Sequence, residues 1–284
     1  MTTSVPILLY HSVADTTAPR FKKWTLHPEF FAVHMQYLAD QHYTPLTVTQ
    51  WLQLLSDRRG ALPERPIVIS FDDGYTDFLV NAVPILQHYG FGATLYVVTK
   101  YVGQSSTWLQ GQGAGDRSLL TWAQLAEVNA AGIECGAHSH THVQLDTVPL
   151  AEAREEIARS KNELEQHLNR SVESFAYPYG YHNALVRELV QEAGFTSACA
   201  VKHALSTVDD DRFALSRIII SADTNVDRFA ELLTGRHLRV APMEEQVWTK
   251  GWRVIRRLRG KLTAPYDLTT SRTTLIRTIL SRFI

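Results

Sequence analysis

The sequence predicts an α/β protein built on a parallel sheet or barrel. Short apolar segments alternate with longer amphipathic segments along most of the chain, which is the order of repeated strand–helix units. The apolar segments, such as PIVISF at 66–71, show no alternation of polar and apolar residues. Strands of this kind are usually buried on both faces, as they are in parallel sheets. We therefore expect the strands to form the centre of the fold and the helices to cover them.

Local signals place the individual elements. Strands are expected within 5–10, 66–71, 89–98, 133–137, 173–178, 195–201 and 216–220, where apolar residues cluster. Helices are expected at 28–41, 48–57, 77–88, 121–132, 150–168 and 182–194, where apolar residues recur at helical spacing. Pro28 opens the first helix, and Gly132 ends the fourth. The clearest helix is 150–168, whose Leu150, Ile157 and Leu164 form one apolar stripe.

The composition is that of a soluble globular protein with one large domain or two small ones. Of the 284 residues, 45% are apolar and 20% are charged, which is enough apolar material for a sizeable core. The formal net charge of −1 gives no reason to expect a nucleic-acid partner. Cys135 and Cys199 both lie in apolar, strand-like stretches, so we expect two buried, reduced thiols.

Charge is distributed unevenly and predicts a domain boundary near residue 235. Residues 1–235 contain 17 Lys/Arg and 26 Asp/Glu, whereas residues 236–284 contain 11 Lys/Arg and 3 Asp/Glu. We expect 1–235 to form the barrel and 236–284 a basic amphipathic helical tail, in which Trp248, Trp252 and Ile255 lie near one stripe. Such a helix can lie on an anionic membrane, or it can pack on the acidic barrel; both interpretations stay open.

The amino-terminal sequence predicts a cytoplasmic protein. MTTSVPILLYHSV, at 1–13, has no basic segment, and its apolar run is too short for a signal peptide. No stretch of the sequence reaches the roughly 18 apolar residues of a membrane span. We therefore expect a cytoplasmic location, and a peripheral position on the inner face of the membrane if the tail binds lipid.

Polar residues with catalytic chemistry follow four of the expected strands. In chain order they are His11, Asp72-Asp73-Gly74, His138-Ser139-His140-Thr141-His142 and Pro178-Tyr179-Gly180. In α/β barrels, functional groups gather at the carboxyl ends of the strands, on one rim. Alone, Asp72-Asp73-Gly74 is more often a turn and His11 a satisfied strand-end residue, and the histidines of 138–142 could equally be a solvated turn. Their coincidence on one predicted rim favours a functional site.

Imidazoles beside two adjacent carboxylates are suited to a catalytic metal site. A divalent cation such as zinc binds imidazole nitrogen and carboxylate oxygen, and a catalytic site leaves a position for water. Two His and one Asp supply three ligands, and the second Asp can accept the proton of the attacking water. The Gly-, Ser- and Gln-rich segment 103–118 is expected to be a long surface loop, of a kind that often covers a site.

Three stretches stand in a recognisable order along the chain: SFDDG at 70–74, HSHTH at 138–142 and YPYG at 177–180. Together they resemble motifs one to three of the polysaccharide deacetylases, carbohydrate esterase family 4, which carry the NodB homology domain. The resemblance covers roughly residues 5–235. It implies a distorted (β/α)7 barrel and metal-dependent removal of acetyl groups, usually from N-acetylated amino sugars.

The resemblance also implies a role for each matched residue. Asp72 matches the general base. Asp73, His138 and His142 match the ligands of a divalent metal, with Zn²⁺ expected and Co²⁺ or Ni²⁺ as alternatives. Tyr179 matches the residue whose backbone amide helps to stabilise the oxyanion of the tetrahedral intermediate.

The chain departs from the family pattern at two points. The Arg that usually opens motif three and orients the base is missing from 175–178, and the late Leu–His pair that usually supplies the general acid is not evident after residue 200. The opening ILLYHSV, at 7–13, is similar to the biofilm-polysaccharide branch of the family, where an early His takes that role. His11 is therefore expected to be the general acid, with His203 as the alternative. His140 has no matched role.

We therefore expect a metal-dependent hydrolase that removes acetyl groups from N-acetylated amino sugars. Its partner would be an N-acetylated sugar within a polysaccharide, an oligosaccharide or a lipid-linked glycan. Alternatives on the same scaffold are an amidohydrolase of another small amide, an O-acetyl esterase, or a barrel that binds glycan without turnover. The intact set of Asp72, Asp73 and the two matched histidines argues against the last alternative.

Overall fold

The computed structural model describes residues 4–57, 62–236, 238, 251, 254 and 255. The chain divides into two units, 1–243 and 244–284, and the described residues belong almost entirely to the first. The predicted tail, 236–284, lies outside the described residues except at a few positions, so its contact with a membrane or with the barrel stays a prediction. Within the described ranges, no helix has the length and apolarity needed to span a bilayer.

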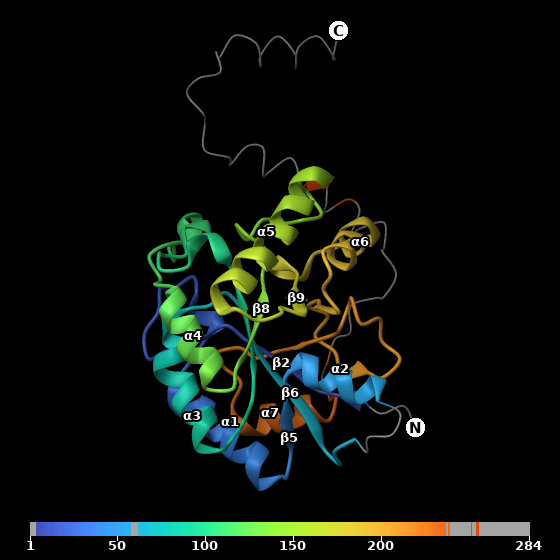
Figure 1. The fold of residues 1–284 in the computed structure, drawn as a ribbon. Coiled ribbons are helices and arrows are strands. Elements are labelled where there is room, and N and C mark those ends of the chain that lie inside the picture. The colour runs from blue at the N-terminus through green and yellow to red at the C-terminus, as the bar shows by residue number, and fades with distance from the viewer. Residues whose placement is uncertain (1–3, 58–61, 237, 239–250, 252–253, 256–284) are drawn as a thin grey trace, which may run out of the picture. The chain divides into compact units, whose positions relative to one another are not determined.

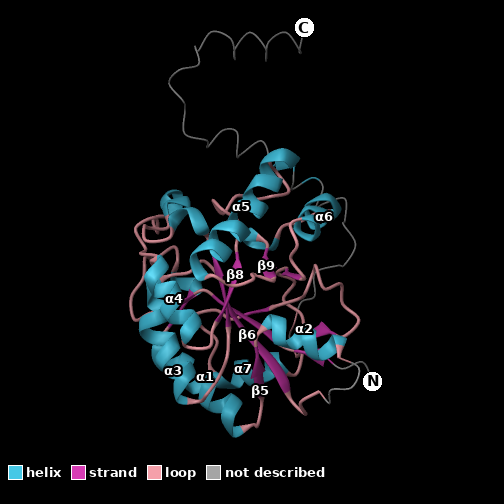
Figure 2. Cartoon of the chain, viewed as in Figure 1, coloured by secondary structure: helices cyan, strands magenta, loops and turns pink. Residues whose placement is uncertain are grey.

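In the described residues the central sheet has eight parallel strands, seven of which follow the order β10-β9-β8-β7-β6-β2-β12. These seven are β2 (Ile7–Tyr10), β6 (Pro66–Phe71), β7 (Thr94–Val97), β8 (Glu134–Ala137), β9 (Ser174–Ala176), β10 (Ser197–Cys199) and β12 (Ile218–Ile219). β5 (Thr44–Leu46) pairs with β6 beside this path. The sheet curls and helices surround it (Figures 1 and 2), which confirms the predicted distorted (β/α)7 barrel.

Six of the seven helices in the described residues begin and end close to the predicted positions, and α7 (Val226–Leu233) was not predicted. The other six are α1 (Pro28–Asp40), α2 (Val48–Ser56), α3 (Val83–His88), α4 (Trp122–Ala130), α5 (Leu150–Leu168) and α6 (Ala184–Glu192). Four 3₁₀ turns occur at Lys22–Trp24, Thr99–Tyr101, Thr107–Gln112 and Pro178–Gly180, and a π turn at Phe78–Ala82 leads into α3. Two further pairings join β1 (Ser4–Val5) to β11 (Ser206–Thr207) and β3 (Ser12–Val13) to β4 (Thr25–Leu26). The predicted end of α4 is confirmed, since Gly132 follows it with a φ of 87°.

Both faces of the central strands are buried, which explains why their sequences do not alternate. Every residue of β2, β6 and β7 is buried. In β6, Ile67, Ile69 and Phe71 pack in the larger apolar cluster, whereas Val68 packs in a second cluster with Trp51 of α2. A strand between two apolar layers has no polar face, so its sequence has no period of two.

Residues 215–219 join the two ends of the sheet. Leu215 forms a bridge with Cys199 of β10, and β12, a few residues later, pairs with β2. Arg217 lies within this joining stretch and is 0% exposed. Cys199 is a buried free thiol, as is Cys135, which confirms the prediction for both cysteines.

Segment 103–118 is more ordered than the predicted surface loop. It contains the 3₁₀ turn Thr107–Gln112 and buries Leu109 and Ala114, which pack in a small cluster with Phe21. The predicted surface loop is therefore present, since most of the segment is exposed, but it is an ordered loop with a few buried side chains. Leu109 and Ala114, which stand among the Gly and Gln residues, anchor the segment in a small apolar cluster with Phe21.

His34 of α1 is a buried histidine that links the helix to its neighbours. Its Nε2 lies 2.9 Å from the carbonyl oxygen of Thr224, its Nδ1 lies 3.2 Å from the hydroxyl of Tyr10, and its ring stacks on Phe229 at 4.1 Å. A neutral imidazole satisfies both polar contacts, donating from Nε2 and accepting at Nδ1. Burial lowers the pKa of His34 to about 4.

We predict that acid destabilises the fold through His34. The unfolded chain takes up the proton near pH 6.5, whereas the folded protein resists it until about pH 4. The free energy of unfolding should therefore fall by about 3 kcal/mol between these values as the pH drops. Urea unfolding across this pH range should show that the free energy of unfolding depends less on pH in His34→Gln than in the wild type. His88→Gln, at an exposed position, is the control and should behave like the wild type. Equal slopes for His34→Gln and the wild type would show that another group is responsible.

Candidate active site

Four strand ends bring the predicted site residues together in one pocket. The pocket has a volume of about 340 Å³, within the range of small-ligand sites. The following predicted residues all line it: His11 after β2, Asp72 and Asp73 after β6, His138 and His142 after β8, and Tyr179 after β9. They meet because the carboxyl ends of parallel strands share one rim of the barrel.

Asp73, His138 and His142 form one cluster of potential ligand atoms. Asp73 Oδ1 lies 3.3 Å from His142 Nε2 and 3.7 Å from His138 Nε2, and the three ligand atoms all lie within 4.8 Å of one another. Ligand atoms about 2.1 Å from a tetrahedral zinc ion lie about 3.4 Å apart, so this spacing fits one shared cation. In the part of the chain that the structure describes, no other group of three or more such side chains is close enough to hold a metal.

His138 is oriented for metal binding by the neighbouring strand. Its Nδ1 lies 2.8 Å from the carbonyl oxygen of Ala176 in β9, so it donates its proton there and leaves the lone pair of Nε2 directed to the cluster. Burial lowers the pKa of His138 to about 4, so the ring is neutral at pH 7. Burial would raise the pKa of Asp73, but the hydrogen bond and charge of His142 outweigh it and hold that pKa below its usual range.

Three residues of the pocket have left-handed backbone. The φ angle is 79° at Asp73, 64° at His142 and 59° at Tyr179. This conformation costs about 1–3 kcal/mol at a non-glycine residue and persists only where the surroundings enforce it. Such residues concentrate at functional sites, and here two of the three belong to the ligand cluster.

Asp72 is buried beside Asp73 and is paired with Arg217. Two nitrogens of Arg217 donate to its two carboxylate oxygens, at 2.6 and 2.8 Å. Burial would raise the pKa of Asp72, but the charge and hydrogen bonds of Arg217 hold it below its usual range. Asp72 is therefore an ionised carboxylate, 3.8 Å from His138 Nε2, that can accept a proton beside the ligand cluster.

Arg217 corrects the interpretation that an arginine orienting the base is missing. The chain supplies it from the residue before β12, and not from 175–178. Its Nε also donates to the carbonyl oxygen of Ala200 at 3.0 Å, which fixes the guanidinium in place. The sequence held a signal for it, since Arg217 is the one charged residue within the stretch 216–220, SRIII. A cation in a buried strand needs a buried anionic partner.

His11 lies in the pocket, and His203 does not. The ring of His11 is 4.9 Å from that of Trp24, and its buried Nδ1 has no hydrogen-bond partner among the described residues. Burial lowers the pKa of His11, against the opposing charges of Asp73 and Asp72. His203 instead accepts a hydrogen bond at Nδ1 from a backbone N–H of β12. Of the two predicted acids, the structure places only His11 beside the carboxylates.

Two loop segments supply an aromatic wall to the pocket. Trp24 comes from the 3₁₀ turn before β4, and Trp108 comes from segment 103–118. Arg117 ties the second segment to the barrel, since it donates to Asp77 at 2.7 Å and lies 4.6 Å over the ring of Phe21. The wall is therefore held by a charged contact as well as by apolar packing.

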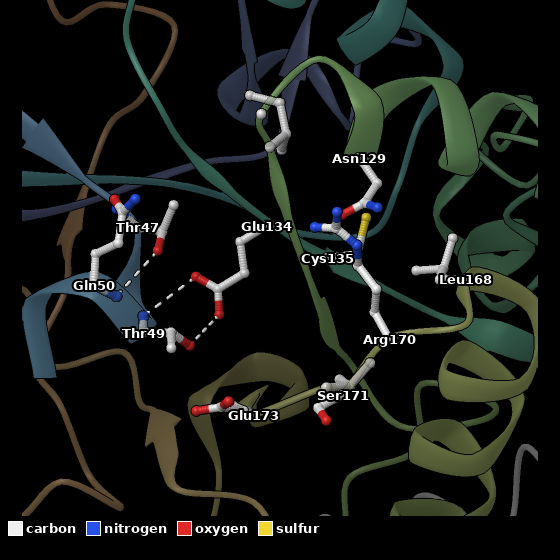
Figure 3. Close-up of a pocket in the computed structure, with 13 residues that line it drawn as sticks. Thr47, Thr49, Gln50, Asn129, Glu134, Cys135, Leu168, Arg170, Ser171 and Glu173 are labelled. Carbon is white, nitrogen blue, oxygen red and sulfur yellow. Dashed lines mark hydrogen bonds between the residues drawn. The ribbon is translucent and has the colours of Figure 1, made fainter. Parts of the chain in front are cut away.

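A second pocket lies at the opposite end of β8, and the carboxylate of Glu134 in it is fully hydrogen-bonded to neighbouring residues. Figure 3 shows Glu134, the first residue of β8, with its carboxylate bonded to the backbone N–H and hydroxyl of Thr49. Thr94 donates to the same carboxylate at 2.8 Å, so the side chain is satisfied. Because Thr49 lies in the first turn of α2, the negative charge is also favourable there. These contacts form a structural junction between α2 and the sheet.

Comparison with known proteins gives a family and relatives whose names fit the chemistry of this pocket. The family model described as polysaccharide deacetylase matches residues 59–198. YxkH of Bacillus subtilis, assigned to the polysaccharide deacetylases, is 28% identical over 218 residues, which cover 76% of this chain and 71% of YxkH. A poly-β-1,6-N-acetyl-D-glucosamine N-deacetylase of Staphylococcus aureus is 24% identical over 217 residues, which cover 73% and 72%. The solved Streptococcus pyogenes deacetylase PplD, in complex with acetate, shares the fold with a TM-score of 0.71 at 22% identity, covering 82% of this chain and 99% of PplD.

The chain has a curled β/α barrel with two imidazoles and two carboxylates at its strand ends. These features are typical of the class of hydrolases that combine a metal ion with a carboxylate base. Within that class, the chain belongs to the polysaccharide deacetylase family. As a member, it is a hydrolase of acetyl groups on sugars.

We predict that replacing Arg217 lowers the free energy of unfolding strongly only while Asp72 keeps its charge. Arg217→Met leaves a buried carboxylate unpaired, and breaking a buried pair in this way costs about 3–5 kcal/mol. The double variant Asp72→Asn/Arg217→Met should recover a large part of that loss, as measured by urea unfolding. Arg187→Met, which breaks the exposed pair with Asp211, is the control and should cost less than about 1 kcal/mol. Additive losses in the double variant would contradict the pairing.

Proposed function

We propose that the chain is a metal-dependent N-deacetylase of glycans that contain N-acetylated amino sugars. The observation that carries this proposal is the different environment of two adjacent carboxylates. Asp73 belongs to a cluster with two imidazoles, whereas Asp72 is held ionised by Arg217. One pocket therefore offers a cation site and a proton acceptor next to it.

The substrate class follows from the relatives and from the pocket wall. The Staphylococcus aureus relative is named for its action on poly-β-1,6-N-acetyl-D-glucosamine, and we extend its class of substrate to this chain. Aromatic rings of Trp24, Trp108, Tyr179 and Tyr181 line the pocket, and the two tyrosines are 40% and 39% exposed. Such rings present an apolar face with a polar tip, which suits the mixed surface of a sugar.

Zinc is the proposed cation, and cobalt or nickel could replace it. Asp73, His138 and His142 would hold it, because their ligand atoms have the spacing of a shared ion and His138 directs an unprotonated nitrogen to the cluster. When bound, the cation would polarise the acetyl carbonyl and lower the pKa of a water molecule.

The remaining chemistry falls to side chains of the pocket. Asp72 accepts the proton of the attacking water, and Arg217 keeps its carboxylate oriented and ionised. The backbone amide of Tyr179 stabilises the negative oxygen of the tetrahedral intermediate. His11 acts in its protonated form and donates that proton to the leaving nitrogen as the carbon–nitrogen bond breaks, so that amine and acetate are released. The proton that Asp72 took from water balances the proton lost by His11.

Asp72→Asn should abolish acetate release and leave the cation bound. Asn keeps the volume of Asp but cannot accept a proton, and loss of a general base lowers the rate by about 10²–10⁴-fold. Asp73→Ala and His138→Ala should instead lose the cation, as measured by metal content after dialysis. An Asp72→Asn protein with full activity would show that another group is the base.

His11 and His203 can be separated as general acids by the leaving group. His11→Gln should slow release of acetate from an N-acetyl sugar by about 10²–10⁴-fold, because the amine must be protonated as it leaves. Hydrolysis of an aryl acetate, whose leaving group needs no proton, should fall much less. His203→Gln should behave like the wild type on both substrates. A selective loss of amide hydrolysis in His203→Gln would reverse the assignment.

A further inference from the structure

Residues 138–142, here called the ligand turn, carry two of the three proposed ligands, and two residues of the turn have an unfavourable backbone conformation. The φ angle is 60° at Ser139 and 64° at His142, in the left-handed region that non-glycine residues rarely adopt. Within the turn, the backbone N–H of His142 donates to Ser139 Oγ at 3.0 Å. A conformation of this kind persists only where neighbouring groups enforce it, so the contacts around the turn matter for the position of the ligands.

Glu156 of α5 binds the ligand turn from outside. Its two carboxylate oxygens accept hydrogen bonds from the backbone N–H and the hydroxyl of Thr141, both at 2.7 Å. The side chain belongs to a residue that is 7% exposed, so these charge-assisted bonds are shielded from water. Because Thr141 directly precedes His142, the two bonds fix the residue next to a proposed ligand.

His140, the middle histidine of the turn, contacts the same helix. Its Nδ1 lies 2.9 Å from Thr99 Oγ1 and 3.3 Å from the carboxylate of Glu163. Glu163 follows Glu156 by two turns of α5, so both carboxylates lie on one face of the helix. The carbonyl oxygen of His140 also accepts from the backbone N–H of Lys100 at 2.9 Å. His140 therefore fastens the turn on its outer side and is not part of the ligand cluster.

We propose that Glu156 is a positioning residue for the metal. It holds the ligand turn so that His142 meets Asp73 and His138 at one point, and it does so through its hydrogen bonds to Thr141. The proposal rests on the metal site proposed above. Groups that orient metal ligands typically change metal affinity about 10–100-fold when they are removed.

The zinc affinity of the purified full chain, measured by competition with a chromophoric chelator, tests this role. Glu156→Ala should bind zinc about 10–100-fold more weakly than the wild type. Glu156→Gln keeps an acceptor oxygen and should be intermediate. Glu155→Ala, at the exposed neighbouring position of the same helix, is the matched control and should bind zinc as the wild type does. The visible spectrum of the cobalt-loaded protein should change in Glu156→Ala and stay unchanged in the control.

Thr141→Val is the second variant, and it decides the question if Glu156→Ala folds poorly. It removes the hydroxyl bond while it keeps the shape of the side chain, and it should also weaken zinc binding. A purely structural role would lower the melting temperature of these variants with zinc affinity unchanged, which would overturn the proposal and leave the metal site intact. Failure of the wild type to bind zinc would overturn both proposals together.

Discussion

Two neighbouring carboxylates are buried at the carboxyl end of β6, and the site depends on how each charge is compensated. Asp72 is 3% exposed and Asp73 is 5% exposed, and each buried ion without a partner costs several kcal/mol. Asp72 is compensated by a guanidinium, which is always charged and leaves the carboxylate ionised. Asp73 faces two imidazoles, and its carboxylate and their ring nitrogens can share a cation. Different partners thus give adjacent, identical side chains different chemistry.

The register of the closing strand is part of the same arrangement. Arg217 reaches Asp72 because β12 pairs with β2 in a fixed register, with Ile218 opposite Leu8. A shift of one residue would turn Arg217 away from the carboxylate, since side chains alternate between the faces of a strand. Closure of the barrel and orientation of the base therefore require the same strand pairing.

Local patterns were sufficient to predict the seven strands of the barrel path and most helices, but they did not predict β5. The bounds of β6 and α5 agree with prediction, because uniform burial and a 3.6-residue stripe leave clear signatures in sequence. The candidate site residues could be placed together because strand ends share a rim. The choice of Asp73 as ligand and Asp72 as base came from the family resemblance. Arg217 was missed because it is 145 positions from Asp72, and pairing across a barrel leaves no local period. Glu156 was missed for a related reason, since a helical Glu in a polar-rich helix resembles a solvated charge until its partner, Thr141, is seen.

The central claim is that the chain is a metal-dependent deacetylase, and acetate release from N-acetylglucosamine oligomers tests it most directly. The protein is first stripped of metal with a chelator and is then reloaded with zinc. The account predicts no release by the stripped protein, and release that rises with added zinc until one ion is bound per chain. Undiminished release by the stripped protein would contradict a metal-dependent mechanism. No release by fully zinc-loaded protein would contradict the assignment of the substrate class.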